Sequence, residues 1–509
     1  MKINLIEFFR ETVKGDPEKT AVVDGKATIT FAGLDERSNR LAGFLSQLMK
    51  GDSRKPVAVF MPKTIGAVVA DVAILKSGNA FMNLDVKTPG ERISNILELI
   101  KPVAIVTDSK SRASVEKISG DIPLIDVDGE FPDVDAKDIE NLTSHLIDTD
   151  LCCIINTSGS TGTPKGVAVN HLNFIDFLYR SQEAFNLSKN EIIGSLSPIV
   201  FDIFVFELFE MMMNSATLVL LPANLSAFPA AILKIMREQH VTFIFWVPTI
   251  MVNIANMGLL VEGCLPDLKL VWFAGEVFPT KQFNIWRHAL PDVKFANLYG
   301  PIETSLDSIF YIIEREIPDN EPIPIGYAYR NTDILLLDAD NNDVKSRTNV
   351  EGEICVRGSS LAMGYYNNPQ KTSEAFVINP TNTHYPEIIY RTGDIGAVND
   401  LGEIMFRGRK DTLIKHQGYR IELAEIEHVI VNTLHLVKNG CVIYHVANKE
   451  ITFVYENDVK LTPADFRKAL ASMLPKYMIP TVYHIEADGL RRNTNGKIDR
   501  LYYKNLINE

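Results

Sequence analysis

A run of glycines, hydroxyl side chains and one lysine carries the strongest chemical signal in the chain. Glycines let a backbone approach a ligand closely, and successive amides form a nest for anions. The hydroxyls add donors and Lys165 adds positive charge, so the mixture suits a triphosphate. The run lacks the glycine–lysine–serine/threonine triplet of a Walker-type loop. It reads Thr157, Ser158, Gly159, Ser160, Thr161, Gly162, Thr163, Pro164, Lys165 and Gly166.

The elements around this loop predict layers of helices and sheets. An apolar strand at 151–155 leads directly into the loop, and strands and helices alternate before it, as at 56–60 and 67–75. Such alternation favours an α/β protein with mostly parallel sheets. From residue 352, glycine-punctuated strands indicate a more antiparallel, β-rich subdomain. A small α+β unit is expected over residues 411–509.

Composition and charge narrow the class of protein. The 509 residues exceed one ordinary core, so at least two domains are expected. The net charge of −13 argues against a nucleic-acid partner, which usually needs a basic face. The five cysteines are scattered without metal-ligand spacing and favour free thiols in a reducing, cytoplasmic setting. The most apolar stretch, 200–221, contains three carboxylates, so we expect no membrane insertion.

Ordered blocks over nearly the whole chain resemble the adenylate-forming enzymes, which include acyl-CoA synthetases, luciferases and the adenylation domains of non-ribosomal peptide synthetases. The glycine and hydroxyl run resembles the phosphate loop of these enzymes. Each further block is weak by itself, but all of them follow in the order of the family. The blocks are residues 75–78 with Asp85, Pro89 and Arg92, then 297–304, 390–394, 408–411, 418–423, 474–480 and 495–500.

The resemblance implies a reaction in two steps, with ATP and Mg²⁺ as cofactors. In the first step a carboxylate attacks the α-phosphorus of ATP and pyrophosphate leaves. Both reactants are anionic, so catalysis depends on positioning and charge neutralisation. Lys497 is the implied catalytic cation, and Glu303 is the implied magnesium ligand, acting through oxygen and water. A solvated lysine and a buried structural carboxylate are the plain alternatives.

The resemblance also implies a nucleotide site. Tyr299 would lie against adenine, Asn297 would read the adenine amino edge, and Asp394 would hold the two ribose hydroxyls. Arg409 would add a ribose or phosphate contact. Without the family context, Tyr299 could be an ordinary core tyrosine and Asp394 an ordinary turn aspartate. Ile302 departs from the family, which usually has threonine there, and this removes one hydroxyl. The implied ATP-binding set is Thr157, Ser158, Gly159, Ser160, Thr161, Gly162, Lys165, Asn297, Tyr299, Gly300, Thr304, Asp394 and Arg409.

The family moves its C-terminal domain between the two steps, so that one site serves both. We therefore expect a core at 1–410 that binds ATP and the substrate, and a mobile domain at 411–509 that carries Lys497. Asp411 matches the hinge position of the family, with a plain linker turn as the alternative. In the second step a thiol captures the activated acyl group.

Asp202 indicates that the acid is an amino acid. Residues 201–207 resemble the pocket block of amino-acid adenylation domains, in which an aspartate at this place holds the α-ammonium group. A facing cation explains a carboxylate within so apolar a run. A helix N-cap is the alternative. The implied pocket set is Asp202, Ile203, Phe206, Phe245, Trp272, Ala274, Gly275, Leu298, Leu306 and Asp307.

Three large aromatic side chains in this set, Phe206, Phe245 and Trp272, leave little room for a substrate side chain. Glycine is expected first and then alanine. Asp307 keeps serine open, because a carboxylate accepts a hydrogen bond from a hydroxyl. Residues 274–279 also resemble the stand-alone D-alanine–carrier protein ligases of teichoic-acid modification, so D-alanine stays open.

The sequence contains neither the serine block of a phosphopantetheine carrier nor the paired histidines of a condensation domain. A separate phosphopantetheinylated carrier protein, loaded in trans, is the expected partner, for cell-envelope aminoacylation or non-ribosomal peptide synthesis. Two other classes stay open: an acyl-CoA synthetase, and a binding protein that kept the fold without the activity. Asp202 argues against the first, because fatty acids and aryl acids have no ammonium group. Lys497 and Glu303 argue against the second.

Overall fold

The chain divides into two compact units. The computed structural model describes residues 2–157, 164–410, 413–456, 461–486, 489–492 and 498–508. No helix in these ranges combines the length and the apolar character that crossing a membrane requires. The larger unit comprises Met1–Val86, Lys101–Ile155 and Val167–Lys410, and the smaller unit comprises Lys87–Ile100, Asn156–Gly166 and Asp411–Glu509.

A seven-stranded, mainly parallel sheet forms one layer of the larger unit. Its strands β3 and β4 are buried along their whole length and pair in parallel, from Pro56 with Ala80 to Phe60 with Leu84. Strands that are buried on both faces carry continuous apolar runs in place of an alternating pattern. The strand order is β18 (Gly364–Tyr365), β8 (Lys165–Asn170), β7 (Leu151–Thr157), β4 (Ala80–Leu84), β3 (Pro56–Phe60), β5 (Ile105–Thr107) and β6 (Leu124–Asp126).

A nine-stranded sheet forms a second layer and is parallel from β13 to β1. Its edges are antiparallel, with β14 and β15 at one end and β2 at the other. The order is β15 (Tyr327–Ala328), β14 (Ile309–Ile312), β13 (Lys294–Tyr299), β12 (Leu270–Ala274), β11 (Phe243–Trp246), β9 (Ile192–Ser195), β10 (Thr217–Leu220), β1 (Thr20–Asp24) and β2 (Ala27–Thr30).

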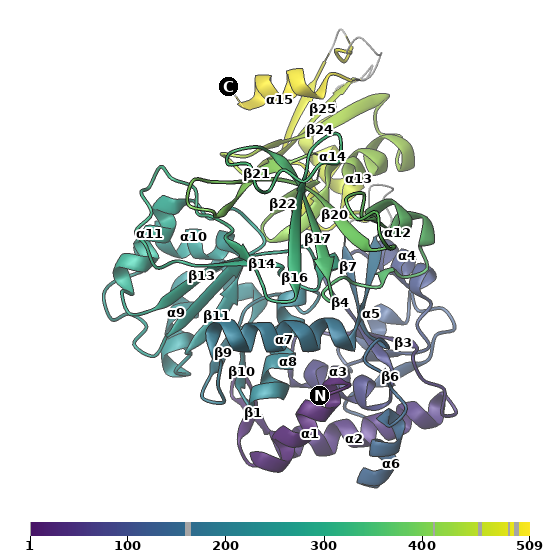
Figure 1. Ribbon diagram of the computed structural model, residues 1–509. Helices are drawn as coiled ribbons and strands as arrows, with labels where there is room; N and C mark the ends of the chain where they lie inside the picture. The colour runs from purple at the N-terminus through teal and green to yellow at the C-terminus, as the bar shows by residue number, and fades with distance from the viewer. Residues whose placement is uncertain are drawn as a thin grey trace. The chain divides into compact units, whose positions relative to one another are not determined.

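Helices pack on both sheets of the larger unit. Helix α3 (Ile65–Lys76) is buried on nearly every side, as its almost unbroken apolar sequence requires. Helices α7 and α8 lie side by side (Figure 1), and the rings of Phe174 and Phe209 meet between them at 4.8 Å. The other helices are α1 (Leu5–Gly15), α2 (Phe31–Leu48), α5 (Arg112–Val115), α6 (Ala136–Thr143), α7 (His171–Phe185), α8 (Asp202–Asn214), η1 (Ala223–Ala227), α9 (Pro229–Glu238), α10 (Pro248–Asn256), α11 (Thr280–Ala289), η2 (Ile302–Thr304) and α12 (Pro369–Ala375).

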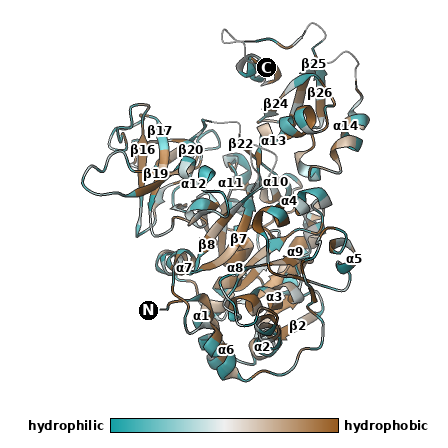
Figure 2. Cartoon of the chain, turned by 90° about the vertical axis from the view of Figure 1, so that its right-hand side faces the viewer, coloured by the Kyte–Doolittle hydropathy of each residue, from teal (hydrophilic) through white to brown (hydrophobic). Residues whose placement is uncertain are grey.

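A five-stranded antiparallel sheet forms a β-rich subdomain within the larger unit, as predicted from residue 352 onward. It shares a core with the nine-stranded sheet, because Tyr299 and Ile309 pack with Ile334, Ile354 and Ile404. Figure 2 shows the apolar residues concentrated on strands such as β7 and β8, with polar residues on outer helices such as α6. The strands are β16 (Thr332–Leu337), β17 (Gly352–Gly358), β20 (Ile388–Val398), β19 (Phe376–Ile378) and β21 (Ile404–Arg409), which pairs with β20.

The smaller unit is an α+β structure with its own core. Phe453, Tyr455 and Phe466 pack together at its centre, with ring centroids 5.2–5.8 Å apart. Together the two units confirm the predicted fold class. The elements are α4 (Gly90–Ile100), β22 (Leu413–His416), β23 (Tyr419–Glu422), α13 (Leu423–Glu427), the π-helix η3 (His428–Thr433), β24 (Asn439–His445), β25 (Glu450–Glu456), α14 (Pro463–Leu470), η4 (Lys476–Met478), β26 (Val482–Ile485) and α15 (Arg500–Asn508).

Candidate active site

A tyrosine, an aspartate and an arginine meet where the nine-stranded sheet joins the β-rich subdomain. The Tyr299 hydroxyl, at the end of β13, donates to Asp394 Oδ2 at 2.5 Å. Arg409 forms an ion pair with the same carboxylate, across the register pair that joins β20 to β21. Burial, followed by the charge of Asp394, raises the pKa of Tyr299, so its hydroxyl remains a donor. We call these three residues the Asp394 triad.

The chain turns sharply after β13 and places several predicted residues close together. A Cβ at Gly300 would lie 2.1 Å from the carbonyl oxygen of Leu306, so only glycine fits there. Ser305 and Leu306 both have left-handed backbones, with φ of 55° and 72°. Such an angle is costly for a bulky residue such as leucine. The Thr304 hydroxyl closes the turn by donating to the carbonyl of Pro301 at 2.9 Å.

Glu303 presents a fully buried carboxylate within this turn. The Tyr365 hydroxyl donates to its Oε1 at 2.8 Å, which fixes the side chain. The described part of the chain holds no group of three or more His, Cys, Asp or Glu side chains arranged around a metal position. Mg²⁺ is commonly held by one or two carboxylates together with substrate phosphates and water, so this single carboxylate fits the ion.

The three predicted pocket aromatics converge. Phe206 of α8 stacks on Trp272 of β12 with ring centroids 5.3 Å apart. Phe245 of β11 lies 5.9 Å from Phe206 and 5.5 Å from Trp272, and Phe245 and Trp272 are partners in the sheet register. All three side chains are completely buried. They form one closed aromatic wall, and around it are buried Ile203, Ala274, Leu298 and Leu306.

Asp202 lies at the first position of α8, directly after the N-cap residue Phe201. Its Oδ1 accepts the amide of Ile203 at 2.9 Å. The alternative that Asp202 is itself the N-cap is therefore wrong, because that position belongs to Phe201. A carboxylate in the first helical turn is stabilised by the helix dipole, and the side chain is only partly buried.

Other predicted residues take defined places in the larger unit. Asn297 donates its Nδ2 to the carbonyl of Pro324 at 2.8 Å, which fixes the orientation of the amide. Gly275 follows β12 with φ of 90°, a left-handed angle that glycine accommodates without strain. Asn297 and Gly275 therefore each have a local structural role, in addition to the binding roles that the sequence predicts.

The described ends of the phosphate loop belong to the smaller unit. Lys165 forms an ion pair of 2.8 Å with Glu422. The Thr157 hydroxyl is buried without a hydrogen-bond partner within the part of the chain that the structure describes, and a buried orphan donor is often satisfied by a ligand or water. The remaining predicted residues lie outside the described residues; they are Ser158, Gly159, Ser160, Thr161, Gly162, Asp411 and Lys497.

The sequence analysis missed Arg180, whose guanidinium lies 5.3 Å from the ring of Phe177, a neighbour of Phe206. Arg180 is 4% exposed, forms an ion pair with Asp176 at 2.7 Å and donates to Thr332 Oγ1 at 2.8 Å. Its guanidinium lies 5.1 Å from the ring of Tyr329, whose pKa is raised by burial and by the charge of Asp307. The i,i+4 pair of opposite charges, Asp176 and Arg180, was the available signal.

Comparisons with known proteins agree with this geometry. Residues 9–366 match the family described as AMP-binding enzyme. Gramicidin S synthase 2 of Brevibacillus brevis is 33% identical over 500 residues, which cover 97% of this chain and 11% of that protein. This chain therefore spans only about a tenth of that relative.

Solved structures share the fold over nearly the whole chain. The Vibrio cholerae adenylation domain AlmE, in complex with glycyl-adenosine-5'-phosphate, has a TM-score of 0.84 at 19% identity, with 99% of this chain and 98% of that chain covered. Holo-PA1221, a non-ribosomal peptide synthetase protein with adenylation and PCP domains, has a TM-score of 0.80 at 20% identity, with 98% and 84% covered.

The fold and the family match together define an ATP-dependent, AMP-forming adenylation enzyme of the type found in non-ribosomal peptide synthetases. The chain belongs to the AMP-binding enzyme family.

Proposed function

We propose that this enzyme activates a small amino acid with ATP, forming aminoacyl-AMP and pyrophosphate, and then transfers the aminoacyl group to the phosphopantetheine thiol of a separate carrier protein. The observation that carries the proposal is the pairing of Asp202 with a closed aromatic wall. Asp202 supplies a carboxylate for the α-ammonium group. Phe206, Phe245 and Trp272 leave little volume for a side chain.

Glycine is the first expected substrate, followed by alanine or serine. The full burial of the three aromatics supports a pocket that ends close to the α-carbon. The structural relative AlmE was solved in complex with glycyl-adenosine-5'-phosphate, which supports the same choice by analogy. Asp307 is the one buried carboxylate of the pocket set, and it keeps serine as the alternative with a hydrogen-bonding side chain.

In the proposed first step, residues of the chain hold two anions close together. Asp394 accepts from the ribose hydroxyls while Arg409 and Tyr299 keep its carboxylate in place. Asn297 reads the adenine edge, and the phosphate loop with Lys165 and Thr304 contacts the phosphates. Lys497 supplies the cation that draws the amino-acid carboxylate toward the α-phosphorus. Mg²⁺, held by Glu303, would neutralise charge on the phosphates.

For the second step we propose that residues 411–509 act as a domain that reorients about Asp411 relative to the core at 1–410. Such a movement lets one active site serve adenylation and thioester formation. The structural relative PA1221 contains adenylation and PCP domains, which supports a carrier protein as the thiol partner.

Amino-acid-dependent ATP–pyrophosphate exchange tests the proposal. The panel contains all amino acids, both enantiomers of alanine, and short fatty acids. We expect the fastest exchange with glycine, and a tenfold preference over alanine corresponds to about 1.4 kcal/mol. Fastest exchange with D-alanine would move the assignment to a D-alanine–carrier protein ligase. Exchange with fatty acids alone would contradict the proposal and favour an acyl-CoA synthetase.

A further inference from the structure

A lysine outside the predicted site anchors the segment that leads to Asp202. Lys63 follows strand β3, and its Nζ donates to the carbonyls of Ser195 and Ser197 at 2.8 Å each. A third bond reaches Ser195 Oγ at 3.2 Å. An ammonium group has three protons, so these bonds use all of them. Ser195 ends β9, and residues 196–201 connect it to α8.

The same lysine also faces the first turns of α8. Its Nζ lies 6.0 Å above the ring of Phe204, and the carboxylate of Glu207 is the main opposite charge near it. Burial lowers the pKa of Lys63 and raises the pKa of Glu207. The attraction between the two charges opposes both shifts, and the charge of Asp24 opposes the shift of Lys63 to a smaller extent. A buried charge is retained where a partner and hydrogen bonds compensate it. Lys63 is thus tied to the chain on both sides of Asp202.

The N-cap residue of α8 makes no side-chain capping bond, and Lys63 supplies side-chain hydrogen bonds to the segment that precedes the helix. Phe201 stands at the N-cap position and cannot accept a hydrogen bond through its side chain. Within the entry segment, the Phe201 amide donates to the Pro198 carbonyl at 3.0 Å. The three bonds from Lys63 therefore hold the start of the segment, and its electrostatic contact with Glu207 holds the helix that follows.

We infer that Lys63 is a positioning residue that fixes the location of Asp202 and thereby sets the affinity for the substrate's ammonium group. The inference rests on the proposed function, because it assigns Asp202 to that group. A displacement of about 1 Å in a group that contacts the substrate costs up to about a hundredfold in rate or affinity. Loss of Lys63 releases the entry segment and produces such a displacement.

Lys76 offers a matched control within the larger unit. It is also buried, at 1% exposed, and donates to Asp35 Oδ1, Asn39 Oδ1 and Ser38 Oγ at 2.6–2.8 Å. Burial lowers its pKa to about 8, against the nearby charge of Asp35. Its partners lie on α2, none of them in the segment that leads to Asp202. Both lysines contribute to stability, but of the two only Lys63 is connected to the segment that leads to Asp202, the carboxylate proposed to bind the substrate's ammonium group.

The test compares Lys63→Met with Lys76→Met in exchange assays that vary amino acid and ATP separately, alongside thermal melting. We expect Lys63→Met to raise the amino-acid KM by about tenfold or more and to leave the ATP KM nearly unchanged. We expect Lys76→Met to lower Tm without changing either KM. Lys63→Arg, which keeps the charge and the donors, should recover most of the amino-acid affinity.

An unchanged amino-acid KM in Lys63→Met, or an equal rise in both KM values, would overturn the inference. If Lys63→Met does not fold, Lys63→Gln carries the same test, because it keeps donors and loses only charge and length. Failure of the proposed function is distinguishable, since the unmodified enzyme would then show no amino-acid-dependent exchange at all. If the enzyme activates fatty acids instead, a changed fatty-acid KM in Lys63→Met would also contradict the inference, because a fatty acid has no ammonium group.

Discussion

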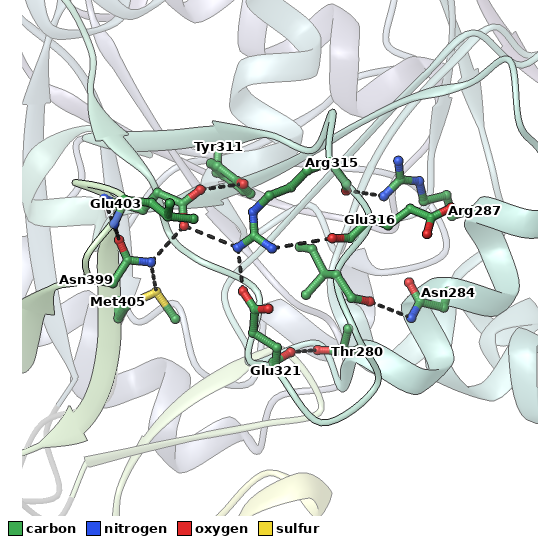
Figure 3. Close-up of polar contacts among 12 residues, drawn as sticks. Thr280, Asn284, Arg287, Tyr311, Arg315, Glu316, Glu321, Asn399, Glu403 and Met405 are labelled. Carbon is green, nitrogen blue, oxygen red and sulfur yellow. Dashed lines mark hydrogen bonds and ion pairs between the residues drawn. The ribbon is translucent and has the colours of Figure 1, made fainter.

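Two triads, each made of a tyrosine, a carboxylate and an arginine, join the nine-stranded sheet to the β-rich subdomain. In the Asp394 triad, Tyr299 of β13 donates to Asp394 at 2.5 Å and Arg409 pairs with the carboxylate. In the second, Tyr311 of β14 donates to Glu403 at 2.6 Å and Arg315 lies 3.3 Å from that carboxylate (Figure 3). We call the latter the Glu403 triad. Both carboxylates are less than 5% exposed.

The surroundings of the two carboxylates differ. Figure 3 shows side chains of the protein around Glu403. Asn399 donates to its Oε2 at 2.8 Å, and Arg315 also forms an ion pair with Glu321 at 2.5 Å. Burial works against its charge, yet the bonds from Tyr311, Asn399 and Arg315 hold the pKa of Glu403 below its usual value. Asp394, by contrast, accepts its hydrogen bond from Tyr299, which is the last residue of β13. The tight turn to Asp307 begins directly after this tyrosine.

From this difference we infer that the position of a triad in the sheet, and not the types of its side chains, decides whether it can contact a ligand. Ligands of α/β proteins bind beyond the carboxyl ends of parallel strands. Tyr299 ends such a strand, whereas Tyr311 lies on the antiparallel strand β14. We therefore expect the Asp394 triad to serve nucleotide binding and the Glu403 triad to hold the two sheets together.

Asp394→Asn should have the largest effect on activity. It removes the charge that would accept two ribose hydroxyls, and it removes the ion pair between Asp394 and Arg409. We expect kcat/KM for ATP to fall by about a hundredfold, equivalent to about 2.7 kcal/mol of transition-state stabilisation. Exchange kinetics at varied ATP measure this change. A fall of less than about threefold would place the ribose site elsewhere.

Glu403→Gln should show the reverse pattern, with a large effect on stability. It removes a buried charge that three side chains satisfy, and we expect the free energy of unfolding to fall by about 2–3 kcal/mol. Chemical denaturation measures the loss, and exchange kinetics at a temperature well below Tm measure activity. A kcat/KM as low as that of Asp394→Asn would erase the distinction between the two triads.

Substitutions of the two tyrosines should have the smallest effects, and they form the most closely matched pair of variants. Tyr299→Phe and Tyr311→Phe each remove one hydroxyl that donates to a carboxylate, so each should cost about 1–2 kcal/mol of stability. Only Tyr299→Phe should also raise the ATP KM, because its hydroxyl orients Asp394. Equal KM values in the two variants would assign both hydroxyls a purely structural role.

Local sequence patterns predicted much of this arrangement, and long-range pairing accounts for what they missed. The triad residues Tyr299, Asp394 and Arg409 each belong to a short block that resembles the family, so their types and spacing were informative. The three pocket aromatics converge as expected, because adjacent strands pair Phe245 with Trp272 and helix α8 packs Phe206 against both rings. The alternation of strands and helices likewise predicted the layered fold.

Residues whose role depends on distant partners left no comparable signal. Lys63 meets Ser197 across 134 positions, and Tyr311 meets Glu403 across 92, so no periodicity or motif connects them. The left-handed backbone at Leu306 is also invisible in sequence, because leucine rarely adopts it. Gly300 was found by its block, but the steric reason for glycine required the fold.

Direct detection of the product tests the central claim most plainly. The purified enzyme, incubated with ATP, Mg²⁺ and glycine, should form glycyl-AMP that mass spectrometry detects, and Asp202→Asn should form little of it because the ammonium group loses its ionic partner. An acyl-AMP formed from a fatty acid but from no amino acid would contradict the assignment. So would full glycyl-AMP formation by Asp202→Asn, because the amino-acid pocket proposed around that carboxylate would then be wrong.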